Sequence, residues 1–271
     1  SMALGAVLAA GAFAPATSFG WSVDVNIGSL SANSAGDTLL FPVYTTAQNA
    51  TTSFSVTNTS DDQTVLAKIR FREQTQSMDV LDFYAILSPN DKFDFWVERP
   101  NGDTRPSMGW DDNTCVVGPA GDRVMFPEPS PWVAFGSDNP EVDMQLGHLE
   151  VIGVANLEDV YTDGSGFNVG PDPDYPTSVA AWALHDSSGV PANCNALVSA
   201  FASPATVSQM NDDMGNDSAL DVDNVLVGRY VITGAGVGIE GGGDAIAIQG
   251  SDLGPGGQNS DPDVNRITAQ S

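Results

Sequence analysis

The sequence predicts an all-β protein: an antiparallel β-sandwich of Ig-like or jelly-roll-like type, with long acidic Gly/Pro loops and an N-terminal extension. Three observations support this prediction. β-Branched and aromatic residues recur in short alternating runs, which is typical of half-buried strands. Turn-forming residues separate these runs at short intervals. The 28 Gly and 17 Pro are spread along the chain and leave little room for helices longer than about three turns.

The first segment is apolar. Residues 2–14 carry no charge and end in Ala-Phe-Ala before Pro15. This pattern is typical of a secretory h-region with a small-residue cleavage site, and it is too short to span a bilayer as a helix. We therefore assign residues 1–20 to export or assembly. We expect an extracellular or bacterial cell-surface location, with no membrane span in the mature protein.

The next segment has the pattern of a strand. Residues 21–27 alternate apolar and polar side chains, and one face carries Trp21, Val23, Val25 and Ile27. A Gly/Ser/Ala linker, residues 28–36, follows. A strand on a flexible linker is what donor-strand complementation of a neighbouring subunit requires. The alternative is that it forms the first strand of its own sheet.

We expect one sandwich domain, residues 37–250, and a polar tail, residues 251–271. Strands are predicted at residues 38–45, 52–58, 64–72, 80–87 and 93–98. In the third, the core-facing residues are Val65, Ala67, Ile69 and Phe71. The opposite face carries Lys68, Arg70 and Arg72, a basic stripe that fits either a solvated surface or a receiver for a neighbour's acidic loop.

The second half alternates strands with long loops. Strands are predicted at residues 144–155, 178–184, 225–233 and 245–248, and one short helix at 194–201. The loops at 163–174 and 211–217 are rich in Asp and Gly.

Cys115 and Cys194, which lie in loop-like surroundings, are the only two cysteines. In an oxidising compartment we expect them to form a disulfide that stabilises the fold by about 4 kcal/mol on the chain-entropy estimate. Two thiols are too few for a structural zinc site without nearby histidines.

The net charge of the chain restricts which partners it can bind. Nine Lys and Arg face 35 Asp and Glu, a net charge of −26. Such a chain repels nucleic acid phosphates, so we expect no nucleic acid partner. Residues 1–123 hold seven basic and 14 acidic groups, and residues 124–271 hold two and 21. This asymmetry fits head-to-tail contacts between copies or simply solvated acidic loops.

No catalytic motif is present in the sequence. Its two histidines, His148 and His185, lie in no nucleophile or metal motif, and there is no Gly-x-Ser-x-Gly or His-Glu-x-x-His. The glycine run at 234–243 continues into more glycine where a phosphate-binding helix should begin. We therefore predict no catalytic residues and no enzyme, although abundant carboxylates leave a glycosidase open.

The acidic loops are candidates for calcium, which takes six to eight oxygen ligands. The spacing does not match an EF-hand. Calcium is the only cofactor that the sequence suggests. Its candidate ligands are Asp163, Asp172, Asp174, Asp212, Asp213 and Asp217.

Four segments carry a resemblance: Asp37-Thr-Leu-Leu-Phe-Pro-Val-Tyr-Thr45, Thr52-Ser-Phe-Ser-Val-Thr-Asn-Thr59, Lys68-Ile-Arg-Phe-Arg-Glu73 and Val80-Leu-Asp-Phe-Tyr-Ala-Ile-Leu-Ser-Pro89. Their succession resembles a family of poorly characterised proteobacterial exported "cell surface proteins", whose β domain also carries a pair of loop cysteines. The likeness covers about residues 37–117 and is faint from 140 to 250. It implies location and fold, because the family has no established activity.

Together these observations predict a structural subunit of an extracellular bacterial assembly: a filament, pilus-like fibre, sheath or surface layer. Its partner would be further copies of itself, joined head to tail by strand donation from residues 21–27. The alternative, from a different class, is a monomeric cell-surface binding or adhesion module whose acidic loops hold calcium or a glycan.

Overall fold

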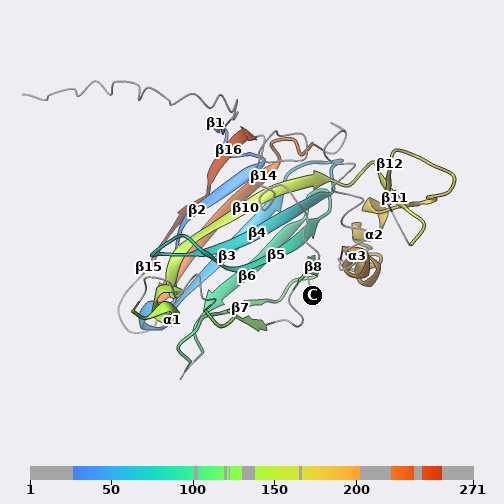
Figure 1. Ribbon diagram of the computed structural model, residues 1–271. Helices are drawn as coiled ribbons and strands as arrows, with labels where there is room; N and C mark the ends of the chain where they lie inside the picture. Colours follow the sequence, from blue (N-terminus) through green and yellow to red (C-terminus); the bar gives the residue numbers. More distant parts are fainter. Residues whose placement is uncertain are drawn as a thin grey trace, which may run out of the picture.

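The computed structural model describes residues 27–100, 103–118, 121, 123–129, 138–164, 167–201, 221–234 and 240–251. They form three antiparallel sheets, which confirms the all-β, sandwich-like prediction (Figure 1). The helices are short: η1 (Ala47–Asn49), α1 (Pro140–Asp143), α2 (Ala180–Ala183) and α3 (Cys194–Phe201).

The largest sheet has seven strands, in the spatial order β1 (Ile27–Leu30), β16 (Ile246–Ser251), β2 (Thr38–Thr45), β10 (Leu146–Asn156), β4 (Val65–Glu73), β5 (Asp79–Leu87) and β8 (Cys115–Val117). The second sheet has six, in the order β15 (Glu240–Asp244), β14 (Leu226–Gly234), β3 (Ala50–Asn58), β6 (Lys92–Glu98), β7 (Ser107–Trp110) and β9 (Arg123–Met125). A small third sheet consists of β12 (Phe167–Val169), β11 (Val160–Thr162) and β13 (Thr177–Ser178).

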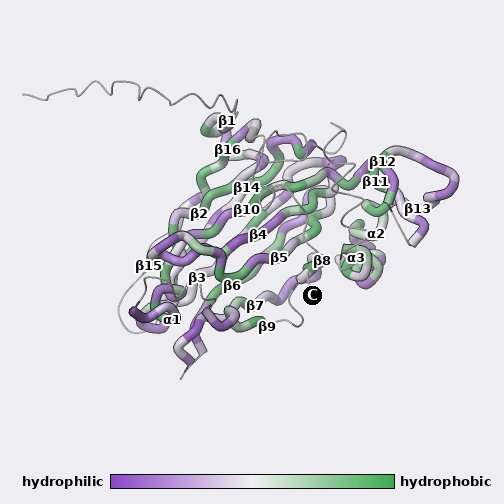
Figure 2. The backbone as a smooth tube through the Cα atoms, viewed as in Figure 1, coloured by the Kyte–Doolittle hydropathy of each residue, from purple (hydrophilic) through white to green (hydrophobic). Residues whose placement is uncertain are grey.

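The main core lies between the two large sheets. It is rich in aromatic rings: Phe54 stacks on Phe95 with ring centroids 5.1 Å apart, and Phe41 meets Phe54 edge-on at 5.4 Å. The predicted core face of β4 is confirmed, because Val65, Ala67, Ile69 and Phe71 all lie in this cluster. Figure 2 shows the short hydrophobic and hydrophilic stretches that alternate along these strands.

A second core covers one end of the outer face of the seven-stranded sheet. There Leu66, Tyr84 and Ile152 pack against a layer made of α2, α3 and the small sheet, which contributes Leu197 and Phe201. Figure 1 shows this layer beside the sandwich. The ends of β4, β5 and β10 are therefore buried on both faces, which explains why the apolar alternation breaks down there.

The predicted strand at 178–184 is wrong for most of its length. The strand β13 ends at Ser178, and Ala180–Ala183 form the helix α2 instead. Alanine is the best helix former, and Val179 and Ala183, four positions apart, are both buried on the second core. The predicted helix at 194–201 is confirmed as α3.

The N-terminal segment enters the sheet at residue 27. Ile27 pairs with Ser251 and Leu30 with Ile248, so Ile27 belongs to a strand of its own chain's sheet. The linker differs from expectation: Gly36 is bound to Leu226 by two backbone hydrogen bonds of 2.9 Å. Trp21, Val23 and Val25 lie outside the described residues, as do residues 1–20 and 252–271.

Candidate functional site

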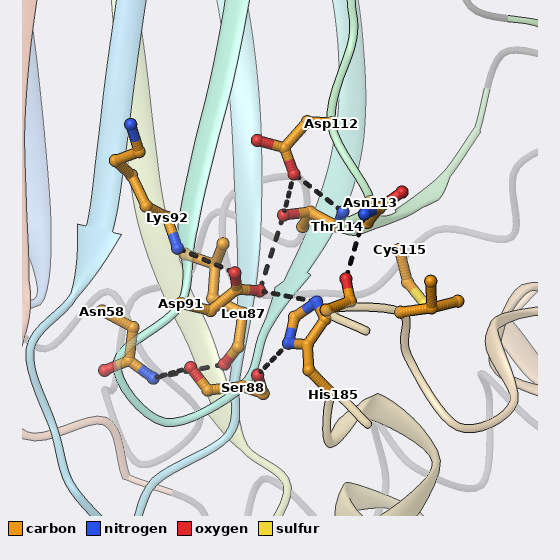
Figure 3. Close-up of polar contacts among 12 residues, drawn as sticks. Asn58, Leu87, Ser88, Asp91, Lys92, Asp112, Asn113, Thr114, Cys115 and His185 are labelled. Atoms are coloured by element: carbon orange, nitrogen blue, oxygen red, sulfur yellow. Dashed lines mark hydrogen bonds and ion pairs between the residues drawn. The ribbon is translucent and has the colours of Figure 1, made fainter. Parts of the chain in front are cut away.

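Polar side chains from three segments meet where the layer of α2, α3 and the small sheet, called the helical layer, joins the sandwich (Figure 3). Ser88 and Asp91 come from the turn between β5 and β6, Thr114 precedes β8, and His185 follows α2. Ser88 Oγ lies 2.9 Å from His185 Nδ1, and His185 Nε2 lies 4.0 Å from Asp91 Oδ2. We call these four residues the Ser–His–Asp cluster.

The surrounding turns are fixed by further hydrogen bonds. The side-chain amide of Asn58 donates to the carbonyl oxygens of Leu87 at 3.2 Å and Ser88 at 3.1 Å. Asp112 accepts hydrogen bonds from both the backbone and the hydroxyl of Thr114, each 2.8 Å long. The cluster therefore sits on a preorganised frame rather than on loosely held loops.

A serine hydroxyl against an imidazole is the contact of a nucleophile and its base. Sequence reasoning missed it, because Ser88 and His185 are 97 positions apart and neither lies in a motif. The geometry favours a structural role: Ser88 is only 2% exposed, and 4.0 Å between His185 and Asp91 is too long for a hydrogen bond. We interpret the Ser–His–Asp cluster as a set of polar contacts that holds the helical layer on the sandwich, and we also call it the clamp.

The clamp has a distinct electrostatic character. Burial raises the pKa of Asp91 above its ordinary value, and the carboxylate of Asp112 adds to this. The imidazole of His185 and backbone hydrogen bonds oppose the rise. Ionising Asp91 therefore costs the folded state free energy, and this cost is smaller when His185 is charged.

The predicted disulfide is present beside the clamp. Cys115 in β8 is bonded to Cys194 at the start of α3, with Cα atoms 5.4 Å apart and a sequence separation of 79. Because β8 is the last strand of the large sheet, the bond ties the edge of that sheet to the helical layer. Covalent and polar contacts thus fasten the same junction.

Two of the three cations of the basic stripe on β4, Lys68 and Arg70, are neither solvated nor open to a neighbour, so both expectations were wrong for them. The side chains of Lys68 and Arg70 are 4% and 5% exposed. Lys68 binds Asp82 at 3.2 Å and Arg70 binds Asp79 at 2.5 Å. Acidic residues on the flanking strands β5 and β10 therefore neutralise the stripe within the chain.

Arg70 shows the consequence of this pairing. Burial lowers the pKa of its guanidinium, but the hydrogen bond and charge of Asp79, with help from Glu150 and Asp82, raise it above its ordinary value. The third cation of the stripe, Arg72, contacts Glu150 at 2.8 Å. The stripe is thus a structural ion-pair ladder across three strands.

The calcium candidates are not assembled into a site in the described part of the chain. Asp172 caps its own turn, accepting a 2.8 Å hydrogen bond from the backbone of Asp174. Among the described residues no three His, Cys, Asp or Glu side chains lie together as metal ligands would, and Asp163 is in no such group. Asp212, Asp213 and Asp217 lie outside the described residues, so calcium binding stays a prediction.

One edge of the large sheet combines β1, which pairs with β16 alone among the described strands, with exposed apolar side chains. Leu30 pairs with Ile248 and Ile246 with Leu40, so these four residues share the outer face. Leu30 is 74% exposed and Ile246 43% exposed. We call this surface the edge patch.

No protein-family model, curated protein or solved structure matches this chain. The resemblance to proteobacterial cell surface proteins therefore stays a prediction. Within the described residues, no helix has the length and apolar character needed to cross a membrane. The disulfide is compatible with an extracellular protein.

Proposed function

We propose that the chain is a non-enzymatic structural subunit of an extracellular bacterial assembly, joined head to tail by strand addition. In this proposal residues 21–26 of one copy add to the outer edge of β1 in the next copy, because Ile27 is already paired within its own chain. The observation that carries the proposal is the edge patch, where the outermost described strand of the seven-stranded sheet and exposed apolar side chains coincide.

The backbone of β1 supplies the pairing groups. This strand is the first in the order of the seven-stranded sheet, with β16 as its neighbour on one side. An edge strand presents N–H and C=O groups that can pair with a strand of another chain. Such an edge is a liability in a monomer, which supports its use as a contact.

The edge patch supplies the apolar contact. A strand added beside β1 would place alternate side chains next to Leu30, and Trp21, Val23 and Val25 have that alternation. Each apolar side chain fully buried contributes roughly 1.5–3 kcal/mol. Several such residues, together with backbone pairing, would make the contact slow to dissociate.

The body of the molecule suits a load-bearing role outside the cell. Disulfides persist mainly in oxidising compartments, and this one fastens the helical layer to the sandwich. The two cores and the ion-pair ladder hold most of the described strands and helices against one another. A disulfide-fastened body with exposed apolar side chains at a sheet edge fits a repeating assembly.

The test is electron microscopy of protein sheared from cells, comparing wild type with a deletion of residues 21–26 and with Leu30→Lys. We expect regular filaments or sheets from wild type and dispersed particles from both variants. Leu30 is 74% exposed, so the lysine should not disturb folding. The matched control is Val142→Lys in α1, which changes a residue 45% exposed outside the patch and should leave assembly intact.

Dispersed wild-type particles would contradict the proposal. Assemblies that survive both the deletion and Leu30→Lys would also contradict it, because the contact would then lie elsewhere.

A further inference from the structure

The outer face of the six-stranded sheet carries a hollow of about 260 Å³ over β3, one of its two central strands. Strand register explains it. Ser53 pairs with Trp96 on one side and with Val231 on the other, so a small residue stands between two large ones. One step along, Ser55 stands between Asp94 and Arg229. The hollow is thus a groove with one apolar and one polar row.

The indole of Trp96 is held in place by its neighbours. Gly109 lies directly opposite it on β7, and a Cβ added there would come within 2.7 Å of Trp96 Cζ2. The indole therefore rests on the bare backbone of Gly109. Its N–H donates to Glu98 Oε1 at 3.3 Å, which fixes the ring orientation. A preorganised aromatic wall lowers the entropy cost of binding a flat apolar surface.

The polar row presents donors and acceptors on the same side as this wall. The Arg229 side chain is 81% exposed and contacts Asp244 at 3.1 Å. Asp94 contacts Lys92 at 2.5 Å, and the carboxylate of Asp111 adds a further acceptor to the lining. Two of the three charged side chains that line the groove, Asp94 and Arg229, are each paired with an opposite charge, whereas the chain as a whole carries −26. An anionic ligand would be repelled by the chain, and the two paired side chains have little charge left for an ionic ligand.

An apolar row beside a row of hydroxyl, carboxylate and guanidinium groups matches a ligand with an apolar face and a rim of hydroxyls. We propose that this groove binds an uncharged saccharide, with the C–H face of one sugar ring against Trp96 and its hydroxyls toward Asp94 and Arg229. Binding sites of this kind combine an apolar surface with a few orienting polar groups. The site is distinct from the acidic loops and from the edge patch, so it goes beyond the proposed assembly.

The test is titration of the full chain with uncharged tetrasaccharides of glucose, galactose, mannose and N-acetylglucosamine, followed by calorimetry and tryptophan fluorescence. We expect at least one of them to bind and to change the fluorescence. Trp96→Ala should weaken that binding by about tenfold or more, the size expected for loss of an aromatic contact. Gly109→Ala should weaken it too, because the new methyl displaces the indole without removing it.

The control is Met125→Ala, at the β9 edge of the same sheet and outside the groove, which should bind as wild type does. Absence of binding by all four tetrasaccharides would overturn the proposal, as would equal binding by Trp96→Ala. If Trp96→Ala instead abolishes assembly, the groove is a subunit contact and the saccharide proposal fails. Failure of the edge-patch variants to affect assembly would leave this result untouched, so the two proposals are separable.

Discussion

At the residue scale, the clamp at the layer junction depends on a buried carboxylate. Asp91 lies within reach of His185, Thr114 and the backbone of Lys92. Burial raises the pKa of Asp91, and the interaction with His185 lowers it by less. The pKa of Asp91 therefore stays above its ordinary value. Folding therefore favours the protonated form, the reverse of an exposed salt-bridged aspartate.

The sign of the pH dependence follows from linkage. A raised folded-state pKa means that the folded chain binds more protons than the unfolded chain between the two pKa values. The contribution of Asp91 to the free energy of unfolding therefore falls as pH rises through its folded-state pKa. We expect Asp91→Asn, which lacks this titration, to gain stability relative to wild type as pH rises from about 4 to 7.

Urea denaturation of both proteins across this range measures the effect. Asp61→Asn, in the nearby exposed turn, controls for loss of a negative charge. His185→Gln in the Asp91→Asn background measures what the imidazole contributes when the Asp91 carboxylate is absent. A stability difference between Asp91→Asn and wild type that does not change with pH would contradict this account of the clamp.

Local alternation in the sequence predicted which side chains face the core, but not which polar side chains meet. Alternation along β4 correctly placed Val65, Ala67, Ile69 and Phe71 in the core. It could not say that Lys68 and Arg70 would be buried, because their partners Asp79 and Asp82 come from the neighbouring strand. The Ser88 and His185 contact was hidden for the same reason.

At the element scale, the turn into β2 is fixed by a glycine. A Cβ on Gly36 would lie 2.2 Å from the carbonyl oxygen of Ile248 in β16, a backbone atom that cannot swing away. The backbone of Gly36 also pairs with Leu226 at the start of β14. Gly36 therefore joins the two large sheets at a point where no side chain fits.

We expect Gly36→Ala to lower the free energy of unfolding by about 1–3 kcal/mol, as overpacking does. Gly241→Ala in β15 is the matched control, because a Cβ there meets nothing within 4 Å, and its effect should stay within about 0.5 kcal/mol. Chemical denaturation compares the two. Equal stability of both variants would show that β2 and β16 separate easily at this point.

Elements with a clear period were predictable, and short ones were not. The predicted strand at 38–45 matches the bounds of β2, and the predicted strands at 52–58, 64–72, 80–87 and 93–98 correspond to β3–β6 with bounds shifted by up to two residues. The sequence analysis did not predict β7, β8 or β9, since strands of three or four residues carry too little alternation to be recognised. At 180–183, helix propensity and burial against α3 outweighed the expected strand.

At the scale of the whole molecule, the disulfide lies in the second core and ties the edge of the seven-stranded sheet to the helical layer, which is otherwise held by packing and the clamp. It closes 79 positions of chain, from β8 across β10 and the small sheet to α3. We expect its removal by the double substitution Cys115→Ala and Cys194→Ala to cost about 2–5 kcal/mol.

Hydrogen exchange distinguishes how that loss is distributed. The amides of α3 should exchange much faster in the double variant, while those of β3 and β6 in the main core should change less. Denaturation midpoints for oxidised and reduced wild type provide the comparison. Unchanged midpoints would mean that packing alone holds the helical layer.

The sequence by itself determined the all-β class, the longer strands, the inward face of β4 and the cysteine pair, because these depend on local periodicity and on the number of thiols. Only the tertiary structure decided which strand segments are buried on both faces, which charges are paired, and that Ser88 contacts His185. It also placed Ser53 between Trp96 and Val231 to form a groove. These outcomes depend on strand order and register, which bring together residues tens to hundreds of positions apart, and no local pattern in the chain records them.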